Sequence, residues 1–188
     1  MEQVTLRYAC LLAVLGASAV VLVPQATARQ HASKHAARPD PVVMTRLLDG
    51  IVARRDETWR WQRLMRRTRT PYAARAGRLT SLEYRRWVFR LWATRATKAE
   101  AQAQKPPHRA EWLCIHRHEG RWKDPDAPYY GGLQMDLEFQ STYAPELLRA
   151  KGTADHWTPL EQMWVAERAY RDRGFWPWPN TARYCGLL

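Results

Sequence analysis

The sequence predicts a mainly α-helical protein, in which a small domain stapled by one disulfide follows a basic helical region. Apolar residues recur at helical spacing between recognisable start and stop signals. The positive charge is concentrated, because residues 29–110 hold 20 of the 30 Lys and Arg but only 6 of the 18 Asp and Glu. Of the three Cys, two remain once an N-terminal apolar run is set aside, and two can pair.

The N-terminus has the pattern of a secretory signal peptide. An uncharged apolar run from Tyr8 to Val23 follows Arg7, and Ala26-Thr27-Ala28 supplies the small residues that a signal peptidase reads. We therefore expect residues 1–28 to be a signal peptide, and the protein to be secreted or associated with the cell envelope. An uncleaved anchor is the alternative, although the run is short for a membrane span.

Residues 29–40 are polar and are predicted to be a flexible spacer. Residues 41–108 then form a basic, Trp-rich helical region. Asp40-Pro41 is a helix start, and the apolar residues that follow at helical spacing predict a helix over 41–55. Ser81 is expected to cap a second helix, which carries an apolar stripe of its own.

Three interpretations of this basic region stay open. The first is a helical hairpin that packs on the C-terminal part through its tryptophan faces. The second is a cationic arm that holds the protein against an anionic cell-envelope surface, such as lipid or wall polymer. The third is nucleic-acid binding, because arginines interleave with tryptophans. An exported protein rarely meets nucleic acid, so no nucleic-acid partner is expected.

The C-terminal part begins with a predicted helix over residues 109–118. Trp112, Ile115 and Glu119 fall on one face of it, together with His116. A carboxyl beside apolar surface loses hydration, which favours its protonated form. A protonated carboxyl can donate a proton to a leaving group, so Glu119 is the candidate catalytic acid.

A turn-rich loop over residues 120–128 follows and leads into an aromatic, double-glycine segment. In this segment Tyr130, Gly132 and Gln134 combine an aromatic ring, tight backbone and an amide, which suits a sugar-binding groove. The alternative is a hairpin-like turn with tyrosine in the core. Asp136 is expected to cap a helix that runs to about residue 149, with a break or kink at Pro145 on the way.

The last helix predicted starts at Thr158-Pro159-Leu160-Glu161, a capping box, and ends at Gly174. The tail that follows, Phe175 to Pro179, is predicted to be non-helical. Its tryptophans, Trp178 among them, are expected to cover the core and to rim the groove.

Cys10 lies in the predicted signal peptide, so the mature chain retains Cys114 and Cys185. A disulfide between them would tie the helix that carries Glu119 to the tail. In the loop-entropy model such a bond stabilises a domain of this size by roughly 4 kcal/mol. A domain of under about 80 residues has a marginal core, so this staple is physically reasonable.

The C-terminal part carries a series of short motifs in a fixed order. They are Glu119, Tyr129 to Gln134, Val165-Ala166-Glu167-Arg168, Trp176-Pro177 and Cys185-Gly186, closing on Leu187-Leu188. In this order they resemble the resuscitation-promoting-factor type of transglycosylase-like domain of actinobacteria. The resemblance covers residues 109–188 and implies a lysozyme-like fold that cleaves peptidoglycan between N-acetylmuramic acid and N-acetylglucosamine. It implies that Glu119 is the general acid, and that Cys114 and Cys185 are the domain's disulfide pair.

The chain departs from this family in two places. The family has Glu-Ser-Gly-Gly after the helix, where this chain has Glu119-Gly120-Arg121-Trp122. The family's Ser-x-x-Thr-Trp pattern is replaced by the stretch from Asp136 to Gln140. Glycosidases with two acids would need a second carboxylate, for which Asp124, Asp126 and Asp136 are candidates. Related lytic enzymes resemble single-acid catalysts that are assisted by the acetamido group of the substrate.

No cofactor is expected, and no metal site is expected either. Cys114, His116, His118 and Glu119 do not have the spacing of the usual zinc ligands. The sequence therefore predicts a secreted enzyme, either a peptidoglycan hydrolase or a lytic transglycosylase. The alternative is a non-catalytic cell-wall-binding or regulatory module of the same fold. The oligomeric state cannot be read from the sequence.

Overall fold

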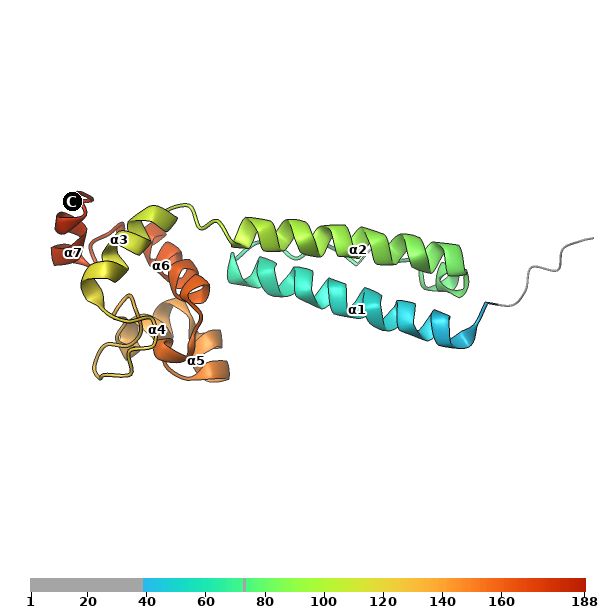
Figure 1. Ribbon diagram of the computed structural model, residues 1–188, viewed down its shortest axis with the longest axis horizontal. Helices are drawn as coiled ribbons and strands as arrows, with labels where there is room; N and C mark the ends of the chain where they lie inside the picture. Colours follow the sequence, from blue (N-terminus) through green and yellow to red (C-terminus); the bar gives the residue numbers. More distant parts are fainter. Residues whose placement is uncertain (1–38, 73) are drawn as a thin grey trace, which may run out of the picture. The chain divides into compact units, whose positions relative to one another are not determined.

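The computed structural model describes residues 39–72 and 74–188, and this part of the chain is mainly α-helical, as predicted. The predicted signal peptide and nearly all of the spacer lie outside the described residues. None of the described helices is both long enough and apolar enough to pass through a membrane. The helices are α1 (Pro41–Leu64), α2 (Leu82–Ala103), α3 (Arg109–Glu119), α4 (Leu137–Tyr143), α5 (Pro145–Lys151), α6 (Pro159–Arg173) and α7 (Pro179–Tyr184), with short 3-10 helices at Ala76–Thr80 and Ala154–His156 (Figure 1).

The starts of α1 and α2 are those that the sequence predicts. The side chain of Asp40 accepts a hydrogen bond from Val42 N at 2.8 Å, and that of Ser81 accepts one from Tyr84 N. Helix α1 is longer than predicted, because the amphipathic pattern continues past the expected end at residue 55. Thr58 is buried on the same helix, and its hydroxyl donates to a backbone carbonyl of the preceding turn.

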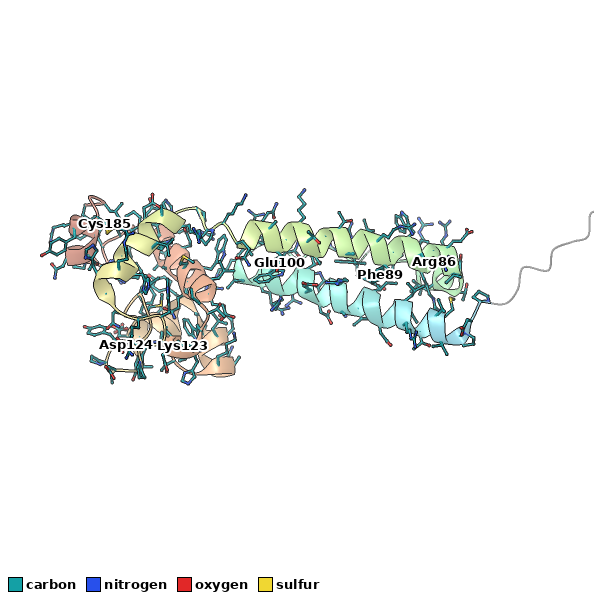
Figure 2. The ribbon with its side chains drawn as sticks, in the orientation of Figure 1. Arg86, Phe89, Glu100, Lys123, Asp124 and Cys185 are labelled. Atoms are coloured by element: carbon teal, nitrogen blue, oxygen red, sulfur yellow. A yellow bond between two sulfur atoms is a disulfide. The ribbon has the colours of Figure 1, made fainter. Side chains whose placement is uncertain are left out.

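Helices α1 and α2 run parallel, so the antiparallel arrangement that a helical hairpin implies is wrong. The packing expected against the C-terminal part is present at the ends of these helices, where Trp61 and Met65 meet Trp164. Arg85 near the start of α2 donates to the carbonyl oxygen of Met44 near the start of α1. Phe89 lies against Gly50, where a Cβ atom would be only 2.8 Å from its ring (Figure 2). At the other ends Met65, just past α1, shares a buried cluster with Ala103, the last residue of α2.

A parallel pair needs a connection that returns along its whole length, and residues 65–81 provide it. Thr70 contacts α1 early in this crossover segment, where its carbonyl accepts a hydrogen bond from Trp59 Nε1 at 2.9 Å. Tyr72 then stacks on Trp92 of α2, and the backbone N–H of Arg75 donates to the hydroxyl of Tyr84. The crossover segment therefore packs along both helices as it returns to the start of α2.

The C-terminal helices enclose a second core, which is larger than the one between α1 and α2. Trp112 and Ile115 of α3 are completely buried in it, together with Leu133 and Trp157. Helix α6 begins with the predicted capping box at Thr158, and it holds more buried residues than any other described helix. The predicted helix from 137 to 149 is interrupted just before Pro145, which begins α5 instead.

The ends of α1 and α2 meet side chains of α6. Trp164 Nε1 donates to the carbonyl oxygen of Ala103 at 2.7 Å, and Arg168 donates to that of Leu64 at 3.1 Å. Burial lowers the pKa of Arg168, and its contact with Glu146 opposes this effect. Arg168 thus remains a buried donor that links α1 to the C-terminal core.

Candidate active site around Glu119

Glu119 is the last residue of α3, and hydrogen bonds to α6 anchor the start of this helix. Glu167 of α6 is buried and accepts hydrogen bonds from the Trp112 indole at 2.9 Å and from the backbone N–H of His108 at 2.7 Å. These contacts fix the first turn of α3 against α6. The carboxyl of Glu119 lies at the opposite end of α3 and is half-buried.

One oxygen of this carboxyl is held by a residue from the end of the chain. The hydroxyl of Thr181 in α7 donates to Glu119 Oε1 at 2.7 Å. The other oxygen, Oε2, accepts no hydrogen bond from the described residues. Glu119 also borders a hollow of about 490 Å³, which is lined by residues 116–122. The free oxygen is therefore available to a bound molecule.

A second hollow, of about 510 Å³, is lined by two of the four predicted groove residues, Gln134 and Trp178. Both hollows are within the size range of ligand pockets. Asp136, the possible second carboxylate, also lines this second hollow, whereas Tyr130 and Gly132 do not. Residues that were not predicted line it too: Tyr129, Glu138, Phe139, Thr142 and Arg173.

Gly120 and Gln134 bring these two parts of the site into contact. A Cβ atom on Gly120 would lie 2.8 Å from Gln134 Nε2 and 3.0 Å from Asp124 Oδ2, so only glycine leaves this space open. The Gln134 amide uses the space to donate to Asp124 at 3.1 Å and to the Gly131 carbonyl at 3.0 Å. Asp124 lies in the loop below α3 (Figure 2). The glycine that departs from the family pattern therefore makes room for a predicted groove residue.

Gly132 is buried, and its backbone groups are used within the protein. Its N–H donates to Gln162 Oε1 at 2.8 Å, and its carbonyl oxygen lies 3.1 Å from His116 Nδ1. A Cβ atom there would approach His116 Nδ1 to 2.6 Å and the Trp122 ring to 2.7 Å. The structure thus gives Gly132 a packing role beneath the stacked rings of His116 and Trp122.

The two tyrosines of the segment have different surroundings. Tyr130 is half-buried against the core and pairs its backbone with Met135. Tyr129 is 49% exposed and borders the second hollow. Trp178 both packs and lines this hollow, since its indole N–H donates to the Leu133 carbonyl at 2.6 Å and its ring meets Phe139. Of the two tyrosines, Tyr129 is the one placed to meet a ligand there.

The candidate second carboxylates have structural partners. Asp136 caps α4 by accepting a hydrogen bond from Phe139 N at 2.7 Å, and it also borders the second hollow. Asp124 accepts the Gln134 amide, and Asp126 is exposed in the loop. Among the three, Asp136 is the carboxylate that combines a fixed position with access to the second hollow.

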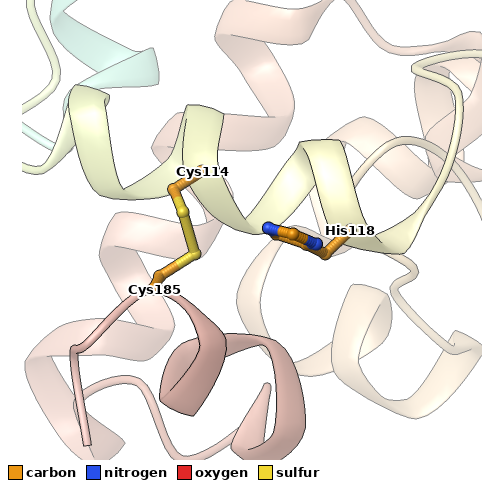
Figure 3. Close-up of side chains that lie close together, drawn as sticks. All are labelled: Cys114, His118 and Cys185. Atoms are coloured by element: carbon orange, nitrogen blue, oxygen red, sulfur yellow. A yellow bond between two sulfur atoms is a disulfide. The ribbon is translucent and has the colours of Figure 1, made fainter.

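The predicted disulfide between Cys114 and Cys185 is confirmed, and it joins α3 to the residue after α7 (Figure 3). Its sulfurs and a ring nitrogen of His118 lie within 4.8 Å of one another. Sulfurs that are bonded to each other do not act as thiolate ligands, so this cluster is a disulfide with a neighbouring imidazole. The bond holds α7, and with it Thr181, next to Glu119.

Two residues that support the site were not predicted. Thr181 lies in α7, a helix that the proline-rich tail did not indicate, and it is 62 positions away from Glu119. Gln162 is completely buried, and its amide also donates to the carbonyls of Trp122 and Ala154. A capping box followed by glutamine is the only local signal for this residue, and it does not specify which loop the amide will reach.

The arrangement can donate a proton from Glu119 to a molecule bound beside α3, and it offers amide, aromatic and charged side chains along the second hollow. No protein-family model, curated protein or solved structure matches this chain.

Proposed function

We propose that this protein cleaves the glycan strand of peptidoglycan, with Glu119 as the general acid. The observation that carries the proposal is the state of the Glu119 carboxyl. One oxygen is held by Thr181 at 2.7 Å, and the other is free beside a hollow. A carboxyl that is oriented but not fully bonded suits proton transfer to a leaving oxygen.

The lining of the second hollow supports a carbohydrate substrate. Tyr129 and Trp178 supply aromatic surface, and the amide of Gln134 can donate to sugar hydroxyls and accept from them. The resemblance of residues 109–188 to the resuscitation-promoting-factor domains adds the identity of the polymer, a chain of N-acetylmuramic acid and N-acetylglucosamine. The protein would meet this polymer after export, which the predicted signal peptide supports.

The proposed mechanism needs one acid and leaves the product to be measured. Glu119 protonates the oxygen of the bond that breaks, and the acetamido group of the substrate stabilises the developing positive charge. If Asp136 takes a proton from water, the water attacks the sugar carbon and the strand is hydrolysed. If the C6 hydroxyl of the same sugar attacks that carbon instead, its proton goes to the Glu119 carboxylate and the product is an anhydro-sugar. In both outcomes Glu119 is the acid that protonates the leaving oxygen.

The test replaces Glu119 with glutamine, which keeps its shape and cannot donate a carboxyl proton. We expect Glu119→Gln to fold and to release muropeptides at least about 100-fold more slowly than wild type, because general acids contribute at least that factor. Glu111→Gln, in the first turn of the same helix, is the matched control and should retain activity. Mass spectrometry of the digest reports the bond and the product type together.

The alternative function is a non-catalytic wall-binding module. The replacement of the family's Ser-Gly-Gly by Gly120-Arg121-Trp122 favours it. Wild-type protein that sediments with peptidoglycan and releases no muropeptides would establish this alternative and remove the proposed enzyme. Retained muropeptide release by Glu119→Gln would instead show that another group is the acid.

A further inference from the structure

The crossover segment carries a charge pattern that the proposed glycan cleavage does not use. Residues 58–82 contain seven arginines and no aspartate or glutamate. Five of these arginines lie in the crossover segment, and all five are exposed. None of the ion pairs formed by the described residues involves a residue between 65 and 81. The segment therefore presents uncompensated positive charge.

Four of these arginines are spread along the crossover segment. We call them the arginine strip: Arg67, Arg69, Arg75 and Arg78. Arg67 donates to Gln102 at the end of α2, and Arg78 is next to Leu79, whose carbonyl accepts a hydrogen bond from Arg85 near the start of α2. From Arg85 to Gln102 a helix rises about 25 Å. The strip is therefore extended along α2, unlike a pocket for a small anion.

The fifth arginine of the segment belongs to a different environment. Arg66 donates to the Tyr143 carbonyl at 3.2 Å, and its charge contributes to lowering the pKa of Glu146. For Glu146 burial acts in the opposite direction and is outweighed by hydrogen bonds and by nearby arginines. Because Arg66 already contacts groups of the C-terminal part, we do not include it in the arginine strip.

Two aromatic rings near the strip, Tyr72 and Trp59, already have ring or guanidinium partners, and Tyr72 is 39% exposed. Tyr72 stacks on Trp92 with ring centroids 6.0 Å apart, and Trp59 is flanked by Arg55 at 4.7 Å and by Arg69 at 5.8 Å. Binding of single-stranded nucleic acid relies on open aromatic faces on which bases stack. The strip therefore favours a polyanion that has charged groups along its backbone and no bases.

From these observations we propose that the arginine strip binds a linear, base-free phosphodiester polymer, of the polyol-phosphate kind. Arginine recognises phosphate through paired N–H donors, and a row of guanidinium groups matches a row of phosphates. This contact is independent of the proposed glycan cleavage and would hold the protein against an anionic envelope polymer.

The test measures binding of fluorescently labelled poly(glycerol phosphate) by anisotropy at several salt concentrations. The strip variant changes all four arginines to glutamine. The control variant removes the same charge from exposed positions elsewhere on α1 and α2. It carries Arg46→Gln, Arg54→Gln, Arg90→Gln and Lys98→Gln. Circular dichroism melts establish that both variants are folded.

We expect the strip variant to bind about 100-fold more weakly and with a shallower dependence on salt, because about four phosphate contacts are lost. The control variant should bind within about threefold of wild type, since surface charges beyond a Debye length are largely screened. Equal losses in both variants would show that net charge alone acts and would overturn the proposal.

Two further probes identify the partner. Tighter binding to poly(dT) than to poly(glycerol phosphate) would overturn the assignment in favour of nucleic acid. Tighter binding to vesicles of phosphatidylcholine and phosphatidylglycerol in equal parts would overturn it in favour of a membrane. Release of muropeptides from soluble glycan fragments is measured separately, so that failure of polymer binding and failure of catalysis can be told apart.

Discussion

At the scale of single residues, Thr181 accounts for how the proposed acid is placed, and Gly120 accounts for how Gln134 is placed. Gly120 leaves room for the Gln134 amide, and the hydroxyl of Thr181 contacts the carboxyl of Glu119 at 2.7 Å. A hydroxyl thus reaches this carboxyl from α7, and not from the residue that follows it in the chain. Thr181 is thus a positioning residue, which acts on the substrate only through Glu119.

Thr181→Val removes this hydroxyl while keeping the shape of the side chain. A hydrogen bond to the neutral, protonated carboxyl of a general acid contributes about 0.5–1.5 kcal/mol, so we expect the loss of this orienting contact to slow muropeptide release by roughly two- to tenfold. Thr181→Ser should restore most of the rate, because it returns the donor. The pH–rate profile of each variant is the decisive measurement. An unchanged profile and rate in Thr181→Val would show that the contact is only structural.

At the scale of an element, Glu161 stabilises the first turn of α6 and also binds a side chain of α5. Glu161 closes the capping box with Thr158 and accepts two hydrogen bonds from Lys151 of α5, at 2.6 and 2.8 Å. Burial by itself would raise the pKa of Glu161, but these bonds from Lys151 and Thr158 outweigh it and lower the pKa below 4.5. The folded protein therefore favours the charged form.

This shift predicts how stability depends on pH. The pKa of Glu161 is lower in the folded than in the unfolded chain, so its contribution is present above pH 4.5 and is lost as the pH falls through the folded value. Glu161→Gln should be less stable at neutral pH and should lose less stability on acidification than wild type. Urea unfolding between neutral and acidic pH measures this. Glu138→Gln, an exposed acid in the first turn of α4, is the control. Parallel curves for wild type and Glu161→Gln would contradict the prediction.

Some elements were readable from the sequence because their signals are local. The caps at Asp40, Ser81 and Thr158 and the break at Pro145 depend on neighbouring residues alone, and all four were predicted correctly. The direction of α2 was not readable, because an apolar stripe has the same spacing in a parallel and in an antiparallel pair.

The residues of the candidate site also fall into those with a local sequence signal and those without one. Glu119 and the lining residues Gln134 and Trp178 come from recognisable motifs, and all three border a hollow. Thr181 and Gln162 could not be found by spacing, since each acts on a segment at least 30 positions away. Such contacts depend on how distant helices pack.

At the scale of the whole molecule, the disulfide closes a loop that contains nearly the entire C-terminal part. Cys114 and Cys185 are 71 positions apart, and the segment between them holds both hollows' principal residues. Closing a loop of this length restricts the unfolded chain strongly. The same bond also holds α7 beside α3, so it supports stability and the position of the acid together.

The double variant Cys114→Ser/Cys185→Ser should lower the free energy of unfolding by roughly 4 kcal/mol, as the loop-entropy model gives for this separation. Urea unfolding followed by tryptophan fluorescence measures the change. Wild type reduced with a phosphine is the matched comparison and should unfold at the same urea concentration as the variant. A loss below about 1 kcal/mol would show that the bond stabilises the protein far less than the loop-entropy model predicts.

The parallel alignment of α1 and α2 has an electrostatic consequence. Each helix carries a partial negative charge at its C-terminal end, and in a parallel pair the two negative ends lie together, which is unfavourable. The side chains that meet these ends are donors or cations: Trp164 at Ala103, and Arg168 at Leu64, whose carbonyl is among the last of α1. Arg66 and Arg67 follow α1 directly. Arg168 therefore offsets part of the negative charge that the two aligned helix dipoles place at this end.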